Sequence, residues 1–433
     1  MYWQACCRLN LELAELLRNR YSMFEMRAIA IRLGRMLYLE RREKADDLNN
    51  KADMKLSKVF LKPECDRFLA AGHPWIFSRA ILSVDGPVEE GATVEVYSSE
   101  KRFLGVGHYG TGNIAVKMLS RERVTDEAGF YRETLQRAIA LRRNLGLFDS
   151  SETNAFRLVH GEGDRLPGLI VDLYARTAVV QCQTAGMMAA RSHILDALRV
   201  LLEEKLDAVF DRSIHVDEGS ANEPAKFLWA KPEGQGPGIC EILEGGLRFF
   251  VDCVNGQKTG FFLDQRENRA LVRRYASGRT VLNAFCYTGA FSVYALSGGA
   301  KEVCSVDSAK RCLDFVGTNC TANAFADRHE EIAADCFDFL NAPFDRLFDL
   351  IILDPPAFVK HQKGIARGLR GYESINYFAM KQIAPGGILF TFSCSQLVQE
   401  SDFRKIVTTA AKRARHPAAG FESIAIARND GTP

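Results

Sequence analysis

Two side chains in the C-terminal part of the chain have types that can do covalent chemistry. Cys394 lies in FTFSCS and Asp354 in LDPPAF, and each follows a short apolar run that is typical of a buried strand. A thiolate is a strong nucleophile, and a carboxyl group nearby can pass a proton to or from the attacked group. A free cysteine, however, also packs like a small hydrophobic residue. Whether Cys394 is a core residue or a nucleophile therefore depends on what the fold places around it.

A second stretch, NAFCYTGAFSVYAL, has the features of a cofactor-binding turn. It holds one glycine, Gly289, whereas the turn that binds a dinucleotide pyrophosphate needs several. Asp307 ends the next predicted strand, 18 residues beyond Gly289, where a carboxylate can accept hydrogen bonds from both ribose hydroxyls. Asp335 follows the third predicted strand, within reach of an adenine amino group. The combination favours S-adenosylmethionine (SAM) over NAD, although Asp307 alone would also suit a helix N-cap.

Further residues of these turns complete the predicted cofactor site. They are Asn283, Phe285, Tyr287, Thr288 and Cys336.

The loop DPPAF is predicted to place a flat ring beside the cofactor. Pro355 and Pro356 restrict the backbone and so give Asp354 a rigid setting. Phe358 and Tyr287 are candidates to line the pocket, although aromatic residues near a strand end are more often part of the core.

The segment NGQKTGFFLDQRENR supplies candidate cations for a phosphate group. Lys258, Arg266 and Arg269 are the candidates. A solvated charged face explains these residues equally well.

The elements that must position these residues form three parts. From residue 279 short apolar runs alternate with helical stretches, which predicts an α/β domain with a doubly wound, Rossmann-like parallel sheet over residues 251–433. In such sheets ligands bind outside the carboxyl ends of the strands. Residues 54–124 alternate short apolar runs with Gly and Pro, which predicts a small β-barrel, and residues 125–250 predict a central α+β subdomain. Residues 1–53 read equally well as a dispensable extension or a peripheral helix.

Composition restricts the class of protein. The 433 residues carry a net charge of +2 and 47% hydrophobic residues, as expected of a globular protein without a global basic field. No apolar run reaches the roughly 18 residues that span a bilayer. The 12 cysteines follow neither a disulfide framework nor a metal-binding spacing. We therefore expect a cytoplasmic protein with reduced thiols, no metal and no membrane contact.

At this point the motifs resemble those of a known family. FVDCVNGQKTGFFLDQRENR, LNAFCYTGAFSVYALSGGAKEVCSVD, FDLIILDPPAF, RGYESINYFAM and GGILFTFSCS are similar to the bacterial 23S ribosomal RNA cytosine-C5 methyltransferase family with an N-terminal PUA domain. LKPECDRFLAAGHPWIFSRAI resembles the opening of that PUA domain. The resemblance covers residues 56–410 and departs from the family at residues 1–53, across 211–240 and after residue 414. It implies a SAM-dependent enzyme that makes 5-methylcytosine, with Asp264 and Gln265 beside the methionine end of SAM.

The implied chemistry requires a nucleophile. Carbon 5 of cytosine attacks a methyl group only after a thiolate has added to carbon 6, so Cys394 is expected to have a lowered pKa. Asp354 would hydrogen-bond the cytosine amino group or share a proton with the ring nitrogen. The expected partner is 23S rRNA or a large-subunit assembly intermediate, with a homodimer left open.

Two alternatives stay open on sequence grounds. An amino-group methyltransferase would use Asp-Pro-Pro without a cysteine. A non-catalytic RNA-binding protein would keep the PUA module and lose activity through its altered C-terminus.

Overall fold

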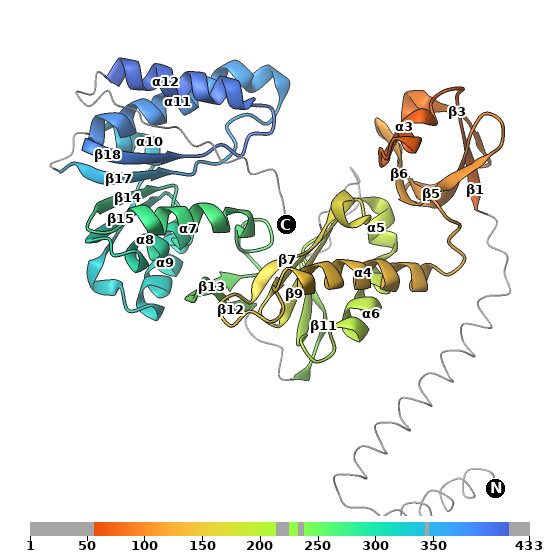
Figure 1. The fold of residues 1–433 in the computed structure, drawn as a ribbon, viewed down its shortest axis with the longest axis horizontal. Helices are drawn as coiled ribbons and strands as arrows, with labels where there is room; N and C mark the ends of the chain where they lie inside the picture. Colours follow the sequence, from red (N-terminus) through yellow and green to blue (C-terminus); the bar gives the residue numbers. More distant parts are fainter. Residues whose placement is uncertain (1–55, 214–224, 233–237, 343–345, 415–433) are drawn as a thin grey trace, which may run out of the picture. The chain divides into compact units, whose positions relative to one another are not determined.

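The computed structural model describes residues 56–213, 225–232, 238–342 and 346–414 (Figure 1). The predicted extension over residues 1–53 and the departure from the family pattern after residue 414 lie outside these residues.

The first described part is a six-stranded sheet with strand order β2-β6-β5-β4-β1-β3, in which only β1 and β4 pair in parallel. Its elements are β1 (Ser57–Leu61), α3 (Arg67–Ala70), β2 (Trp75–Phe77), β3 (Ile81–Asp85), β4 (Thr93–Tyr97), β5 (Phe103–Tyr109) and β6 (Ile114–Ser120). Alternate residues such as Val59, Leu61, Val94 and Val96 point inward and form one small core. The predicted short β-rich domain is thereby confirmed.

The central part is a five-stranded sheet with order β11-β10-β9-β8-β7. Its elements are α4 (Glu127–Asn144), β7 (Ala155–His160), β8 (Leu169–Tyr174), β9 (Thr177–Cys182), α5 (Ala185–Ala189), α6 (Arg191–Leu201), β10 (Ala208–Asp211) and β11 (Lys226–Ala230). Asp126 caps α4 by accepting a hydrogen bond from Gly129 N, and Ala175 turns the β8–β9 hairpin with a φ of 51°. The helices and the sheet agree with the expected α+β character of this part.

The C-terminal part contains a sheet with order β16-β15-β14-β17-β18, in which every strand pair is parallel. The chain adds β15 and β16 on one side of β14 and then β17 and β18 on the other. Its elements are α7 (Arg266–Tyr275), β14 (Thr280–Ala284), α8 (Ala290–Ser297), β15 (Glu302–Asp307), α9 (Lys310–Ala322), β16 (His329–Ala333), α10 (Cys336–Asn341), β17 (Phe348–Leu353), α11 (Ile365–Gln382), β18 (Ile383–Thr391) and α12 (Glu400–Ala414). Helices cover both faces of the sheet (Figure 1). This arrangement confirms the doubly wound sheet.

Alternation along the central strands explains the two covered faces. Leu350 and Ile352 of β17 pack in the cluster that contains α8 and α9. Ile351 and Leu353 pack in the cluster that contains α11 and α12. Strands buried on both faces read as continuous apolar runs, which is why FDLIIL was recognisable.

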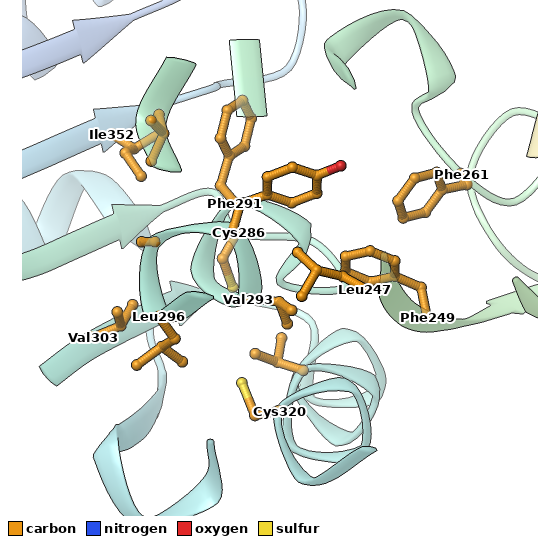
Figure 2. Packing of buried hydrophobic residues seen from close by; sticks show 14 of the residues in the cluster. Leu247, Phe249, Phe261, Cys286, Phe291, Val293, Leu296, Val303, Cys320 and Ile352 are labelled. Carbon is orange, nitrogen blue, oxygen red and sulfur yellow. The ribbon is translucent and has the colours of Figure 1, made fainter. Parts of the chain in front are cut away.

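A separate hairpin, β12 (Ile239–Glu244) and β13 (Leu247–Asp252), joins the core of the C-terminal part. Figure 2 shows Leu247 and Phe249 of β13 beside Phe261 and Val293 in one cluster. The expected boundary at residue 250 falls within β13, so it cuts through this hairpin.

In the described part of the chain, no helix combines the length and the apolar character that crossing a membrane requires.

Candidate functional site

The loop between β14 and α8 has a constrained backbone. Phe285, Tyr287 and Gly289 have φ angles of 60°, 48° and 75°, in the left-handed region that residues with a Cβ rarely adopt. A Cβ on Gly289 would lie 2.4 Å from Val316 Cγ1 of α9, so glycine is required here by both conformation and packing. Strain of this kind is typical of ligand-binding turns.

Asp307 stabilises this loop from the end of β15. Its carboxylate accepts hydrogen bonds from Tyr287 N at 3.0 Å and from Ala309 N at 3.0 Å. A carboxylate has about four acceptor positions, so capacity remains for a ligand. Asp307 therefore stabilises the turn from a position expected of a ribose-binding residue, whereas the N-cap of α9 is Ala309 and not Asp307.

A cavity of about 250 Å³ opens at the carboxyl ends of β14, β15 and β17. Ten predicted site residues and Phe262 are among the residues that line it. The ten are Lys258, Gln265, Phe285, Tyr287, Thr288, Asp307, Asp354, Pro355, Pro356 and Cys394. The hydroxyl of Thr288 is buried in this lining and has no protein partner among the described residues. An unpaired buried hydroxyl is costly unless a ligand satisfies it. With Gly289 and Asp307, it makes the lining suitable for the polar groups of SAM.

Asp354 lies at the end of β17 and contacts Gln265. Gln265 Nε2 donates to Asp354 Oδ2 over 3.1 Å, and Gln265 Oε1 accepts from Asn268 Nδ2 at 2.6 Å. Burial, reinforced by the charge of Asp264, raises the pKa of Asp354 to about 7. A carboxyl group that is half protonated at neutral pH can both donate and accept a proton.

Cys394 follows β18, which pairs in parallel with β17. Its Sγ donates to Pro355 O at 3.6 Å, so the thiol lies against the Asp-Pro-Pro loop. Burial, followed by the charge of Asp354, raises the pKa of this thiol, while Lys258 opposes the shift. This corrects the expectation of a lowered pKa, because the apolar surroundings and the neighbouring carboxylate both disfavour a thiolate.

Five predicted cofactor residues lie outside the residues that line this cavity, namely Asn283, Asp264, Gly289, Asp335 and Cys336. Asn283 is fully buried and donates to Ser292 Oγ at 2.8 Å. Asp335 caps α10 by accepting from Phe337 N and Asp338 N. Cys336 accepts a hydrogen bond from Phe285 N at 3.2 Å. Asn283 and Cys336 therefore stabilise the segments on either side of the turn through contacts with Ser292 and Phe285. The adenine contact of Asp335 stays a prediction.

Two predicted substrate residues are engaged in the protein interior. Phe358 packs on Tyr372 with ring centroids 4.6 Å apart, so it belongs to the core, as its alternative interpretation had it. Arg266 forms an ion pair with Glu244 at 3.2 Å and also donates to Ala155 O. This corrects the expectation that Arg266 meets phosphate, because its guanidinium is occupied by internal acceptors.

The two predicted residues Lys258 and Asp264 form an ion pair with 3.8 Å between Nζ and Oδ2. Lys258 lines the cavity and its side chain is 52% exposed, whereas Asp264 is outside the lining. Lys258 thus remains accessible to a ligand.

Several lining residues escaped the sequence argument. They are Gln257, Phe262, Phe291 and Ser308. Ser308 directly follows Asp307, so its place after a strand end was a usable signal. The apolar character of Phe262 and Phe291 instead resembled that of core residues.

Two family descriptions match the chain. A PUA-like domain matches residues 59–121, and an S-adenosylmethionine-dependent methyltransferase domain matches residues 225–415. The second match contains every residue of the cavity, so SAM is the cofactor of this domain.

Curated relatives align over most of their own length. A ribosomal RNA large subunit methyltransferase I from Alteromonas mediterranea is 39% identical over 82% of this chain and 89% of the relative. The protein of the same name from Aeromonas hydrophila is 36% identical over 85% of this chain and 93% of the relative.

Solved structures share the fold. A Streptococcus mutans protein assigned to the SAM-dependent methyltransferases has a TM-score of 0.68 and 25% identity, covering 82% of this chain and 90% of that one. A methyltransferase structure complexed with SAH has a TM-score of 0.69 and 24% identity, with the same coverage.

Proposed function

This chain belongs to the ribosomal RNA large subunit methyltransferase I family, and from that premise we propose that it forms 5-methylcytosine in 23S rRNA with Cys394 as nucleophile. The observation that carries this proposal is the meeting of Cys394 and Asp354 at one cavity. They come from the ends of two paired strands, and the strained SAM-type turn lines the same cavity.

The residues that fit SAM lie in the turn after β14 and at the end of β15, and Thr288 and Asp307 of this group line the cavity. Thr288, Gly289 and Asp307 would hold its polar groups, and Gln265 would lie beside its methionine end. SAM, when bound, supplies an electrophilic methyl group.

The protein side chains would prepare the cytosine. Cys394 Sγ forms a bond to carbon 6 as its proton leaves, and the ring electrons move toward nitrogen 3. Asp354 supplies a proton to nitrogen 3, which makes the ring an enamine whose carbon 5 is nucleophilic. After methylation, the carbon-5 proton is lost to water and its bonding electrons form the double bond to carbon 6, which expels Cys394 as thiolate. Nitrogen 3 returns its proton to Asp354, and this restores the neutral ring.

Because the pKa of Cys394 is raised, this mechanism requires that the thiol first lose its proton. The thiolate is a minor form in the free enzyme, so its proton must move to a nearby acceptor as the substrate arrives. Asp354, with a pKa of about 7, is the acceptor in the same cavity. The proton can therefore travel from Cys394 through Asp354 to nitrogen 3 without entering bulk water.

The RNA must present a single unstacked base to a cavity of this size. We propose that the PUA-like domain binds the surrounding RNA, as free 23S rRNA or as a large-subunit assembly intermediate. A homodimer stays a prediction.

Replacing the thiol tests the nucleophile directly. Cys394→Ala is expected to lower methyl transfer from tritiated SAM to 23S rRNA by about a thousandfold or more, because a covalent nucleophile has no substitute. Cys312→Ala, a partly buried cysteine of α9 outside the cavity lining, should keep near wild-type activity. SAM binding by calorimetry should be similar in both variants.

Bisulfite sequencing of rRNA from cells with and without the gene identifies the product. A single cytosine that loses its protection in the deletion strain supports the proposal. An unchanged pattern would contradict the assigned product.

An amino-group methyltransferase is the second candidate, and the raised pKa of Cys394 is the observation that favours it. Undiminished methyl transfer by Cys394→Ala would select this candidate.

A further inference from the structure

The backbone of Lys258 is in an unusual conformation for a residue with a long side chain. Its φ is 51°, in the left-handed region, where glycine or asparagine would be less strained. Neighbouring Gly256 and Gly260 show that glycine occurs in this loop. A strained lysine between two glycines therefore points to a requirement for its side chain.

Six consecutive residues of this loop are fixed by hydrogen bonds. The contacts are Arg212 Nη1 to Gly256 O at 2.6 Å, Gln257 N to Tyr287 OH at 2.8 Å, Gln181 Nε2 to Lys258 O at 3.4 Å, Thr259 Oγ1 to Asp172 Oδ2 at 2.6 Å, Tyr287 OH to Gly260 O at 2.9 Å and Phe261 N to Tyr174 OH at 3.2 Å. Such dense contacts can maintain a strained conformation.

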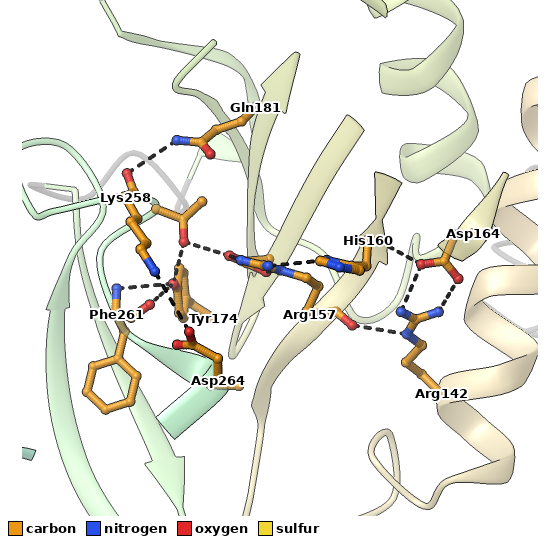
Figure 3. A network of polar contacts seen from close by, with 12 residues as sticks. Arg142, Arg157, His160, Asp164, Tyr174, Gln181, Lys258, Phe261 and Asp264 are labelled. Atoms are coloured by element: carbon orange, nitrogen blue, oxygen red, sulfur yellow. Dashed lines mark hydrogen bonds and ion pairs between the residues drawn. The ribbon is translucent and has the colours of Figure 1, made fainter. Parts of the chain in front are cut away.

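Most of these contacts come from the central subdomain. Asp172 of β8 is fully buried, forms a two-point ion pair with Arg157 and accepts from Thr259. Tyr174, also on β8, lies 2.8 Å from Thr259 Oγ1 through its hydroxyl. Figure 3 shows this network running from Arg157 to the loop that bears Lys258 and Phe261. The central sheet thus fixes a loop that lines the methyltransferase cavity.

The ammonium of Lys258 lies in the same lining as the reacting groups. Nζ is 4.6 Å from the centre of the Phe262 ring and 3.8 Å from Asp264. Asp354 and Asp264 act on Cys394 with negative charge, whereas Lys258 acts on it with positive charge. Arg269, the other cation acting on Asp354, is buried against Glu244 with 2.6 Å between the charged groups.

Building on the proposed function, we propose that Lys258 stabilises negative charge on Cys394 Sγ, and that Thr259 and Tyr174 are the residues that position it. The thiol is partly buried in the cavity that also holds Asp354 and Lys258, and the negative charges of Asp354 and Asp264 disfavour its thiolate, so an opposing charge is needed before it can attack. Lys258 supplies that charge from a loop fixed to another subdomain, and both carboxylates also benefit from it.

Alkylation of Cys394 by iodoacetamide measures the thiolate without requiring RNA. At a pH below the thiol's pKa the alkylation rate is proportional to the thiolate fraction. A shift of about one unit in the pKa of the thiol therefore changes the rate about tenfold. Lys258→Met is expected to slow alkylation of Cys394 about tenfold at pH 8.5, as followed by peptide mass spectrometry. Lys258→Arg keeps the charge and should retain most of the wild-type rate.

Two controls show whether a change in the alkylation rate is specific to Lys258 and Cys394. Lys101→Met removes another exposed lysine with a left-handed backbone, φ 62°, from a turn of the N-terminal sheet, and should leave the rate at Cys394 unchanged. Cys65, partly exposed in the turn between β1 and α3, should be alkylated at one rate in every variant.

The positioning residues are tested with a matched pair. Thr259→Val removes the hydroxyl that donates to Asp172 and should slow alkylation of Cys394 less strongly than Lys258→Met. Thr259→Ser retains the hydroxyl and should restore the rate, which a purely space-filling role for Thr259 would not predict. Equal rates for the Val and Ser variants would overturn the positioning role.

The main outcome to reject the proposal is an unchanged alkylation rate in Lys258→Met. If that variant instead weakened only SAM binding or RNA binding, Lys258 would be a ligand contact and the charge role would be lost. Methyl transfer by Cys394→Ala reports on the proposed function separately. Slowed alkylation together with an active Cys394→Ala enzyme would reject the proposed function while leaving the electrostatic effect of Lys258 in place.

Discussion

At the scale of single residues, the site pairs a carboxyl group and a thiol whose pKa values are both raised. Burial raises the pKa of Asp354 to about 7 and raises that of Cys394 from its usual value. The first proton therefore leaves the pair near pH 7 and chiefly from the carboxyl group. The reactive arrangement, with charge on sulfur and a proton on Asp354, is a minor tautomer of that singly protonated pair.

This order determines the pH dependence of the reaction. Below pH 7 both groups are protonated, so kcat/KM should rise about tenfold per pH unit and level off above about pH 7. In Asp354→Asn the levelling-off near pH 7 should be absent and kcat/KM should keep rising toward pH 9, because the thiol with its raised pKa is then the group that must lose a proton. Methyl transfer at subsaturating RNA from pH 5.5 to 9 measures the profile. A flat wild-type profile across pH 6–8 would contradict the assignment.

At the scale of elements, one buried ion pair connects the β12–β13 hairpin to α7. Arg269 donates through Nε and Nη2 to the two carboxylate oxygens of Glu244 at 2.7 and 2.8 Å, and both side chains are almost fully buried. Arg266 reaches the same carboxylate. Two arginines that the sequence offered as phosphate ligands are thus engaged by Glu244 of β12.

Breaking this pair should destabilise the methyltransferase part. Glu244→Gln leaves Arg269 without its buried counter-charge, which typically costs about 3–5 kcal/mol of unfolding free energy. Glu241→Gln, on the same strand, disrupts only the exposed pair with Arg248 and should cost less than about 1 kcal/mol. Urea denaturation followed by circular dichroism compares the two variants. Similar midpoints for both would show that the buried pair contributes little.

At the scale of the whole molecule, the cavity depends on segments that are distant in sequence. Lys258, Asp307, Asp354 and Cys394 come from four different strand ends or loops and line one cavity. The central subdomain contributes indirectly, through Asp172 and its contact with Thr259. Binding of a ligand to this cavity should therefore stabilise the folded state of the enzyme as a unit.

SAM at 100 times its Kd is expected to increase the unfolding free energy by about 2.7 kcal/mol. Gly289→Ala should largely abolish this gain, since a Cβ would collide with Val316 and displace the turn. Gly278→Ala is the matched control, because Gly278 has a φ of 68° but open space around its Cα. Thermal unfolding with and without SAM provides the readout. A full ligand-induced shift in Gly289→Ala would contradict the role of this turn.

Much of the architecture could be predicted because its signals are local. The continuous apolar run FDLIIL reflects a strand buried on both faces, and the single Gly289 reflects one left-handed position. Asp307 and Asp354 were recognisable as residues that directly follow such strands. The contacts of Arg266 and Phe358 could not be predicted from local sequence, because their partners Glu244 and Tyr372 come from other elements.

The sequence by itself determined the alternation of strands and helices in the C-terminal part, the SAM-type turn and the position of Cys394 shortly after the last strand. Periodicity and turn chemistry depend on neighbours within a few residues, so one chain suffices to read them. Only the tertiary structure decided the electrostatic state of the site. The pKa of Cys394 depends on its burial and on the charges of Asp354 and Lys258. These charges act through space, and Lys258 lies more than 90 residues from Cys394 in the sequence.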